Sequence, residues 1–393
     1  MDFINYLVIV FSCLLAIPTL FFTVQVAVAA VKTIPSTAKE GRRPSIAILI
    51  PAHNEERIIS QTLNSISPQL QNNDRLLVVA DNCSDDTANI ARKFSKHVIE
   101  RRDETQCGKG YALDFGLQFL ADNEPPEVVI IIDADCQISE TCIDVLAKQA
   151  ESENRPVQAL YLMQSPEKKS IAQAIAEFAW KVKNQVRPLG MMRLGLPCQL
   201  MGSGMAFPWE LLQRVNLANG NMVEDMKLGV DLALLGFSPS FCPNALVTSE
   251  FPSSTRVTNE QRKRWEHGHL TTIFTELPRL FATAFKQKNY KLLSMALDLS
   301  VPPLSLLGLC LVITFSLSVV LMIVTNNATS IEITSVLMSI FMTTVLIAWF
   351  KFGREIMTFK DLCGIPFYIL RKIPLYFSFL LNRQQEWVKT ERD

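Results

Sequence analysis

Two pairs of carboxylates in the sequence have the residue types and the spacing for chemistry. Asp133 and Asp135 directly follow the aliphatic run Val128–Ile132, and Glu224 and Asp225 begin an apolar helical stretch. Two acids on alternate positions repel each other unless a cation joins them, and Mg²⁺ or Mn²⁺ binds carboxylate oxygens together with phosphate oxygens. The first pair therefore predicts a binding site for a divalent metal and a diphosphate. The second pair is either an acidic first turn facing the helix dipole or a general base for an acceptor hydroxyl.

Polar residues also follow two other expected strands. Asp81 stands at the tip of the run Leu76–Ala80, where its carboxylate can accept the N–H of uracil or of another base edge. Pro51 and Glu55 follow the run Ile46–Ile50. Acidic residues there also suit a helix start without any ligand.

Two glycine-containing segments indicate places where a backbone approaches a ligand. Gly108-Lys109-Gly110 stands at an expected helix start and offers amide groups and an ammonium to a phosphate. It lacks the full P-loop pattern, so it does not predict a nucleoside triphosphatase. Gly202 and Ser203 belong to a Gly-Ser-Gly interruption of a strand, which indicates either close approach to a ligand or an ordinary bulge.

A third candidate group lies further along the chain. Gln261, Arg264 and Trp265 have the i, i+3 and i+4 spacing that places them on one helix face. An arginine can pair with a diphosphate leaving group, and a tryptophan is a platform for a sugar ring. A basic helix beside a membrane is the alternative interpretation.

The elements that must position these residues alternate between strands and helices from Ser45 to about Ser249, which predicts an α/β domain with a largely parallel sheet. Ligands of such sheets lie beyond the carboxyl ends of the strands, where the candidate residues stand. The expected strands are Ile46–Ile50, Leu76–Ala80, His97–Glu100, Val128–Ile132, Val157–Leu162 and Leu200–Phe207. The expected helices between them are Glu56–Ser67, Asp85–Lys96, Tyr111–Ala121 and Thr141–Ala150.

Composition excludes several classes of protein. The chain has 393 residues, of which 49% are hydrophobic and 19% charged, and its mean hydropathy is +0.19. This balance is unusual for a purely soluble protein. The 38 basic residues equal the 38 acidic ones, so no global field attracts nucleic acid, and we expect no nucleic-acid partner. Nine cysteines without a C-x-x-C pair predict neither a zinc ribbon nor a disulfide framework, which favours a reducing compartment.

Three apolar stretches are long enough for membrane-spanning helices: Phe3–Val31, Val301–Val324 and Ile333–Phe350. Lysines and arginines flank them on one side, which predicts an outside N-terminus with the middle segment and the C-terminus inside. A cleaved secretory signal is the alternative for the first stretch, but the start lacks positive charge and the apolar run is too long. Residues 361–393 begin with an apolar segment broken by charge and proline, which favours a helix in the headgroup plane.

The motifs P-A-x-N-E, D-A-D, G-S-G, E-D and Q-x-x-R-W occur in the order found in membrane-bound family 2 glycosyltransferases, which the sequence resembles. Cellulose, hyaluronan and poly-N-acetylglucosamine synthases and ceramide glucosyltransferases share this layout. The resemblance implies a GT-A fold that binds a nucleotide sugar and inverts the anomeric centre. It also implies that Asp225 is the catalytic base and that Asp135 binds Mg²⁺ or Mn²⁺, with Asp133 beside it.

The residues and the resemblance together give the expected site. The residues expected to bind the nucleotide sugar are Pro51, Glu55, Asp81, Lys109 and Asp133. Those expected at the acceptor and the diphosphate are Gly202, Ser203, Glu224, Gln261, Arg264 and Trp265.

The expected organisation is a transmembrane anchor at 1–31, a cytoplasmic GT-A domain at 45–282, two transmembrane helices at 300–350, and an interfacial helix with a C-terminal tail at 361–393.

We expect an integral protein of a bacterial inner membrane that transfers a sugar from a nucleotide-diphosphate sugar to a lipid or glycan acceptor. UDP is the nucleotide that we expect in the donor. A processive polysaccharide synthase with an export partner or an oligomeric pore is one alternative. A sugar nucleotidyltransferase and a non-enzymatic membrane scaffold with a degenerate site are the others.

Overall fold

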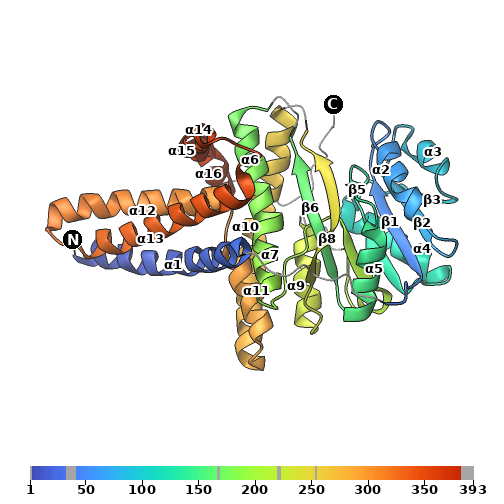
Figure 1. Cartoon of the computed structure of the whole chain (residues 1–393), viewed down its shortest axis with the longest axis horizontal. Helices are drawn as coiled ribbons and strands as arrows, with labels where there is room; N and C mark the ends of the chain where they lie inside the picture. The colour runs from blue at the N-terminus through green and yellow to red at the C-terminus, as the bar shows by residue number, and fades with distance from the viewer. Residues whose placement is uncertain (1, 32–40, 166–168, 219–222, 253–254, 382–393) are drawn as a thin grey trace. The chain divides into compact units, whose positions relative to one another are not determined.

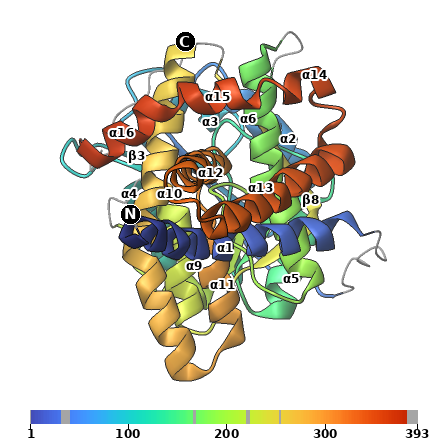
Figure 2. The same ribbon diagram turned by 90° about the vertical axis from the view of Figure 1, so that its left-hand side faces the viewer.

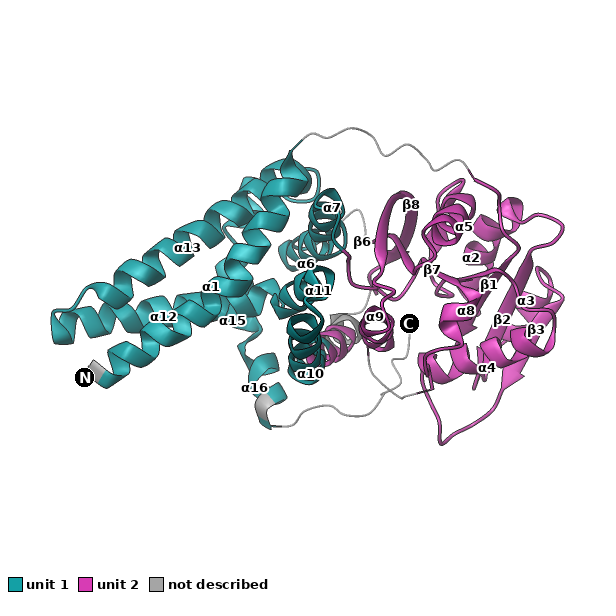
Figure 3. Ribbon diagram, turned by 90° about the horizontal axis from the view of Figure 1, so that it is seen from below, with its two compact units in different colours: residues 1–33, 167–196, 269–384 teal, residues 34–166, 197–268, 385–393 magenta. Residues whose placement is uncertain are grey.

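The computed structural model describes residues 2–31, 41–165, 169–218, 223–252 and 255–381. The chain forms two compact units, which Figure 3 shows in different colours. Unit 1 comprises residues 1–33, 167–196 and 269–384, and unit 2 comprises residues 34–166, 197–268 and 385–393. Residues 167–196 therefore belong to the same unit as the apolar helices.

Unit 2 is built on an eight-stranded sheet with the strand order β3-β2-β1-β4-β7-β6-β8-β5 (Figure 1). The strands β3, β2, β1 and β4 are parallel to one another, whereas β7 is antiparallel to β4 and to β6. The strands are β1 (Ile46–Ala52), β2 (Arg75–Asp81), β3 (His97–Arg101), β4 (Val128–Ile131), β5 (Gln137–Ile138), β6 (Val157–Gln164), β7 (Met205–Pro208) and β8 (Ser240–Glu250). The predicted α/β class is confirmed, with an antiparallel portion that the sequence did not indicate.

The central strands are aliphatic because helices cover both faces of this part of the sheet. Ala47 and Leu49 of β1 pack with Leu113 and Leu117 in one core, and the alternate residues of β1 are also fully buried. The helices of unit 2 are α2 (Ile59–Ile66), α3 (Thr87–Arg92), α4 (Lys109–Asp122), α5 (Cys142–Glu153), α8 (Trp209–Leu212), α9 (Glu224–Leu234) and the first part of α10 (Thr255–Gln287). All four helices expected from the sequence are present, each with slightly different ends.

The strand order contains the feature that positions a ligand site. From β1 the chain passes to β2 and β3 on one side, and then to β4 on the other side of β1. Connections therefore leave the carboxyl ends of β1 and β4 in opposite directions, and ligands of open α/β sheets bind at such a switch point.

Unit 1 consists of helices. Within the described residues, three of its helices are long and apolar enough to cross a membrane, at Phe3–Ala30, Leu304–Thr325 and Thr329–Gly353, close to the predicted stretches. The helices are α1 (Asp2–Ala30), α6 (Ile171–Lys181), α7 (Arg187–Arg193), the second part of α10, α11 (Tyr290–Ser300), α12 (Leu304–Thr325), α13 (Thr329–Ala348), α14 (Phe359–Leu362), α15 (Ile365–Arg371) and α16 (Ile373–Leu381). A π-helical turn, Val182–Val186, joins α6 to α7.

The helices α1, α12 and α13 pack against one another (Figures 1 and 2). The hydroxyls of Thr23 in α1 and Thr344 in α13 lie 2.9 Å apart, and the rings of Phe22 and Phe341 have centroids 6.3 Å apart. Small hydroxyl residues at such contacts bond back to carbonyls of their own helix and allow close packing in an apolar surrounding. This arrangement suits three helices that cross a bilayer together.

Helix α7 lies directly against α1. A Cβ atom added at Gly190 of α7 would stand 2.2 Å from the backbone oxygen of Gln25, so a larger residue there would force the helices apart. Arg187 of α7 forms an ion pair with Asp298 of α11 at 2.8 Å, and Gln25 donates a hydrogen bond to the same carboxylate at 2.6 Å. All three side chains are buried. These polar contacts join α1, α7 and α11.

The segment after α13 forms three short helices, α14 to α16, which run across the direction of α12 (Figure 2). Phe359, Phe367, Leu370 and Phe377 on these helices are exposed. The predicted interfacial segment 361–393 lies partly here, and its residues 382–393 lie outside the described residues.

Candidate active site

The carboxyl ends of β1 and β2 are joined by a side chain. Nδ1 of His53 donates a hydrogen bond to the backbone oxygen of Asp81 at 2.6 Å, and the amide of Glu55 donates to Oγ1 of Thr87 at 2.8 Å. Pro51 is the last residue but one of β1. The predicted nucleotide-binding residues of β1 and β2 therefore stand at one edge of the sheet.

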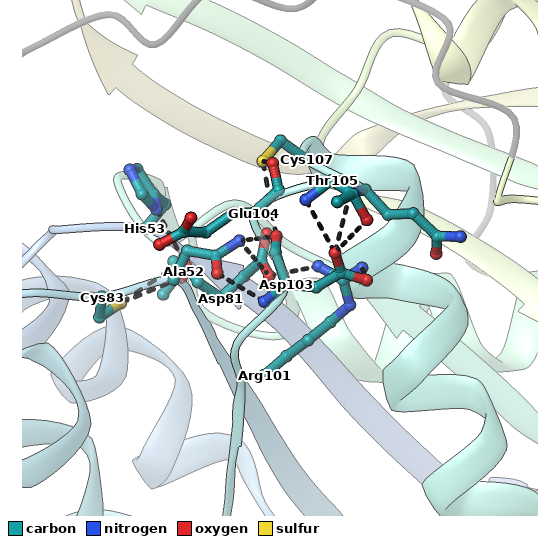
Figure 4. Close-up of polar contacts among 11 residues, drawn as sticks. Ala52, His53, Asp81, Cys83, Arg101, Asp103, Glu104, Thr105 and Cys107 are labelled. Carbon is teal, nitrogen blue, oxygen red and sulfur yellow. Dashed lines mark hydrogen bonds and ion pairs between the residues drawn. The ribbon is translucent and has the colours of Figure 1, made fainter.

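Asp81 is part of a buried polar network (Figure 4). Nη1 of Arg101 donates to Oδ1 of Asp81 at 2.8 Å, and Nη2 of Arg101 lies 3.2 Å from Oδ2 of Asp103. Burial raises the pKa of Asp81 above its ordinary value, and the bond from Arg101 opposes this rise. Arg101 was not among the predicted site residues.

Lys109 brings together the acids of two segments that are distant in the sequence. Its Nζ lies 2.5 Å from Oδ1 of Asp133, donates to the backbone oxygen of Gly202 at 2.7 Å and lies 3.6 Å from Oε1 of Glu224. A Cβ atom added at Gly202, whose φ is +94°, would stand 3.4 Å from Oδ2 of Asp225 and 3.9 Å from Nζ. Five of the predicted residues therefore form one cluster.

The cluster is partly buried, which makes its charges interact strongly. Burial alone would lower the pKa of Lys109, but the carboxylates of Asp133, Glu224 and Asp225 raise it above its ordinary value. Lys109 is therefore a permanent cation among these acids. Burial raises the pKa of Asp133, with Lys109 opposing and Asp135 adding to the rise.

Ser203 is fully buried and its hydroxyl binds the backbone of Asp133. The amide of Asp133 donates to Oγ of Ser203 at 3.0 Å, and Nε2 of Gln158 donates to the backbone oxygen of Ser203 at 2.9 Å. These bonds orient the turn after β4. The predicted contact of Ser203 with an acceptor stays a prediction.

The turn after β4 has ligand atoms that suit a divalent metal. One oxygen each of Asp133 and Asp135 and Sγ of Cys136 lie within 4.8 Å of one another. Burial and the adjacent carboxylates raise the pKa of the Cys136 thiol well above its ordinary value, so it is neutral beside the acids. The two carboxylates are hard oxygen ligands of the kind that Mg²⁺ and Mn²⁺ prefer.

The predicted face of Gln261, Arg264 and Trp265 lies on α10. Gln261 is buried, whereas Arg264 and Trp265 are half-buried. One turn further, a Cβ atom added at Gly268 would stand 2.7 Å from Cγ1 of Val223, the residue before α9. Helix α10 therefore passes close to the start of α9, where Glu224 and Asp225 stand.

We expect the stability of the metal-free protein to fall as the pH rises toward 7, because burial raises the pKa of Glu224 to about 7, with Lys109 opposing and Asp225 adding to the rise. The unfolded chain releases this proton near pH ~4.3. Between the two values the folded protein binds a proton that the unfolded chain has lost, so stability falls with pH.

Thermal unfolding between pH 5 and 8, in detergent with EDTA, measures this effect, and Glu224→Gln is expected to reduce the fall. Glu210→Gln, at an exposed position, is the control and is expected to behave like the unaltered protein. Parallel curves for the unaltered protein and Glu224→Gln would contradict the assignment.

The parallel strands β3-β2-β1-β4, with a lysine-linked acidic cluster after β4, define an α/β domain of the GT-A class. Residues 44–268 match the family model described as "Glycosyltransferase like family 2". Because this match covers more than half of the chain, the chain belongs to that family. The resemblance expected from the motifs is thereby confirmed.

Relatives of known name agree with the family. The chain is 26% identical over 253 residues to "Probable glycosyltransferase YdaM" of Bacillus subtilis, and this match covers 61% of the chain and 58% of that protein. It is 28% identical over 131 residues to "4,4'-diaponeurosporenoate glycosyltransferase" of Staphylococcus haemolyticus, covering 31% of the chain and 34% of that protein. The matches thus cover less than two thirds of the length of these relatives.

A solved structure matches nearly the whole chain. The mannosyltransferase PcManGT from Pyrobaculum calidifontis, in complex with GDP-Man and Mn²⁺, has a TM-score of 0.60 and 14% sequence identity, and the match covers 97% of this chain and 99% of that chain. At this identity the likeness is one of fold. It extends beyond the sheet domain to the helices of unit 1.

Proposed function

We propose that the chain is a membrane-anchored, metal-dependent, inverting glycosyltransferase that moves a sugar from a nucleotide-diphosphate sugar to the hydroxyl of a lipid or saccharide. The observation that carries the proposal is the contact of Lys109 with Asp133, Gly202 and Glu224, beside Asp225. This cluster stands at the switch point of the sheet, where a diphosphate and an acceptor can meet.

The donor end of the site is built from the sheet. Asp81 would contact the base, and Pro51, Glu55 and Asp133 would contact the nucleotide. Asp133 and Asp135 would hold Mg²⁺ or Mn²⁺, which supplies positive charge to the diphosphate as it leaves. The Mn²⁺ and GDP-Man bound to the mannosyltransferase of the same fold support a metal and a nucleotide sugar here.

The acceptor end of the site performs the proton transfer. The carboxylate of Asp225 takes the proton of the acceptor hydroxyl while that oxygen forms a bond to C1 of the sugar. The bond between C1 and the phosphate oxygen breaks at the same time, so the nucleoside diphosphate leaves and the configuration at C1 is inverted. Lys109, Arg264 and Gln261 would stabilise the charge on the departing diphosphate, and Trp265 would carry the acceptor sugar.

The membrane anchoring rests on the three long apolar helices of unit 1. Lysines and arginines beside their ends support a cytoplasmic location for residues 45–282. We propose a bacterial inner membrane as the location of the protein. The exposed aromatic residues of α14 to α16 suit the interfacial placement proposed for residues 361–393. We propose a lipid as the acceptor, and a glycan acceptor is the alternative.

Release of nucleoside diphosphate tests the proposal. The detergent-purified protein is supplied with UDP-, GDP-, CDP- and TDP-sugars, with Mg²⁺ or Mn²⁺ and a lipid extract. We expect metal-dependent release from one class of donor. Asp135→Ala is expected to abolish release and to weaken Mn²⁺ binding, measured separately by electron paramagnetic resonance.

Asp144→Ala is the control, because Asp144 lies in the first turn of α5 and its carboxylate pairs with Arg43 at 2.7 Å, so the substitution removes an acid that is not among the expected metal ligands. Product length on a gel separates a single transfer from processive polymer synthesis. If the unaltered protein neither binds nor turns over any donor, the enzyme proposal fails and a membrane scaffold becomes the better interpretation.

A further inference from the structure

The carboxylate of Asp81 is held by a neighbouring strand rather than by its own loop. Asp81 ends β2 and Arg101 ends β3, and the two residues are register partners in the parallel pair. Their side chains are each 9% exposed, and Nη1 of Arg101 lies 2.8 Å from Oδ1 of Asp81. The guanidinium carbon also stands 5.7 Å from the centre of the Tyr111 ring. Arg101 is therefore fixed from several sides.

The second carboxylate beside Arg101 is itself locked in place (Figure 4). Oδ1 of Asp103 accepts bonds from the amide and the hydroxyl of Thr105 at 2.9 and 2.7 Å and from the amide of Gln106 at 3.0 Å. The side chain of Asn82 bonds to both the amide and the carbonyl of Asp103, at 2.8 and 3.0 Å. The loop after β3 is thus joined to the end of β2, and the carboxylate of Asp103 is held beside Arg101.

The two oxygens of Asp81 consequently differ. Oδ1 accepts from Nη1 of Arg101 at 2.8 Å and from Nδ2 of Asn82 at 3.3 Å. Across the part of the chain that the structure describes, Oδ2 accepts no hydrogen bond. A base that approaches Asp81 would find one open acceptor.

Bases differ in how many acceptors they need. Uracil and thymine present a single N–H between two carbonyls on this edge, which one carboxylate oxygen satisfies. Guanine presents two adjacent donors, N1–H and the exocyclic amine, which both oxygens of a carboxylate would have to accept. Cytosine presents a lone pair at N3, which a carboxylate repels.

We propose that Arg101 sets the base specificity of the donor by occupying one oxygen of Asp81, so that the site accepts uracil or thymine and rejects guanine and cytosine. This inference rests on the proposed glycosyltransferase function and names the donor class as a UDP- or TDP-linked sugar. Arg101 acts here as a positioning residue, through Asp81.

Binding of free nucleotides tests the inference. Isothermal titration of the full-length protein with UDP, GDP and CDP, in Mn²⁺, gives the three affinities. We expect UDP to bind at least about tenfold more tightly than GDP or CDP, the effect of one buried hydrogen bond lost. In Arg101→Met, Asp81 gains freedom to present both oxygens, and we expect the preference for UDP over GDP to shrink by about the same factor.

Arg102→Met is the matched control, because Arg102 is the next residue, its side chain is 79% exposed and it lies 3.7 Å from Glu100. We expect it to leave all three affinities unchanged. If Arg101 has only a structural role, Arg101→Met would lower the affinities for UDP and GDP by the same factor. That outcome would overturn the inference.

Asp81→Asn provides a second test that keeps the size of the side chain. Arg101 can only donate, so it would hold the amide oxygen and leave the amide nitrogen to face the base. A donor at that position suits N3 of cytosine, and we expect CDP to bind more tightly than UDP in this variant. An unchanged order of the bases would overturn the inference. If the unaltered protein turns over a GDP-sugar instead, the specificity proposal fails while the glycosyltransferase proposal stands.

Discussion

Asp225→Asn is expected to lower kcat for sugar transfer by about 10²–10⁴-fold, the usual contribution of a positioned general base. Asparagine has the shape of aspartate but cannot take a proton from the acceptor hydroxyl. Asp225 stands at the start of α9, beside Gly202 and Lys109, whereas Asp81, which would bind the nucleobase, ends β2 and is left unaltered. We therefore expect the affinity for the nucleoside diphosphate to change little.

The measurement combines single-turnover kinetics with isothermal titration. Asp231→Asn is the control on the same helix, since Asp231 pairs with Lys227 in an i,i+4 arrangement at 2.5 Å. That variant should retain its turnover. Full activity of Asp225→Asn would show that another group is the general base, and Glu224→Gln would then be the variant to assay.

Most of the sheet could be predicted from the sequence because its central strands are unbroken aliphatic runs. The strands β1, β2, β3, β4 and β6 lie where they were expected, within two residues at either end. The long strand β8 was not predicted, because Pro243 and Asn244 interrupt its apolar residues. The structure accommodates this interruption with an irregularity between Ala159 and Leu160 of the partner strand β6.

The segment predicted as a strand at Leu200–Phe207 was only partly correct. Strand β7 begins at Met205, because Gly202 and Gly204 have positive φ values of +94° and +67°. The sequence left open whether these glycines mark a ligand or a bulge. The carbonyl of Gly202 accepts from Lys109, which places it in the cluster of acids.

Two features of the candidate site could not be predicted, because they depend on contacts between distant segments. Lys109 was expected to contact phosphate, and nothing in its surroundings along the chain indicated its contacts with Asp133 and Glu224. Arg101 was not predicted because the expected strand ended at Glu100, whereas β3 ends at Arg101, at the same edge of the sheet. Basic residues at strand ends carry the same positional information.

Arg187→Met is expected to destabilise unit 1 by about 3–5 kcal/mol, the usual cost of removing one partner of a buried ion pair. Arg187 and Asp298 are 8% and 7% exposed, and Arg187 also donates from Nη2 to the backbone oxygen of Asp298 at 2.7 Å. Without the arginine, the carboxylate would remain buried with Gln25 as a neutral donor at 2.6 Å. Thermal unfolding in detergent measures the loss, and Lys286→Met, at an exposed position of α10, is the control.

The double variant Arg187→Met/Asp298→Leu separates the cost of the unpaired charge from the value of the pair. Replacing a whole buried pair by apolar residues of similar size is often neutral, so we expect the double variant to recover most of the stability lost in Arg187→Met. Such recovery would mean that the pair specifies how α1, α7 and α11 meet rather than adding net stability. A double variant less stable than Arg187→Met would show instead that the ion pair itself stabilises the contact between these helices.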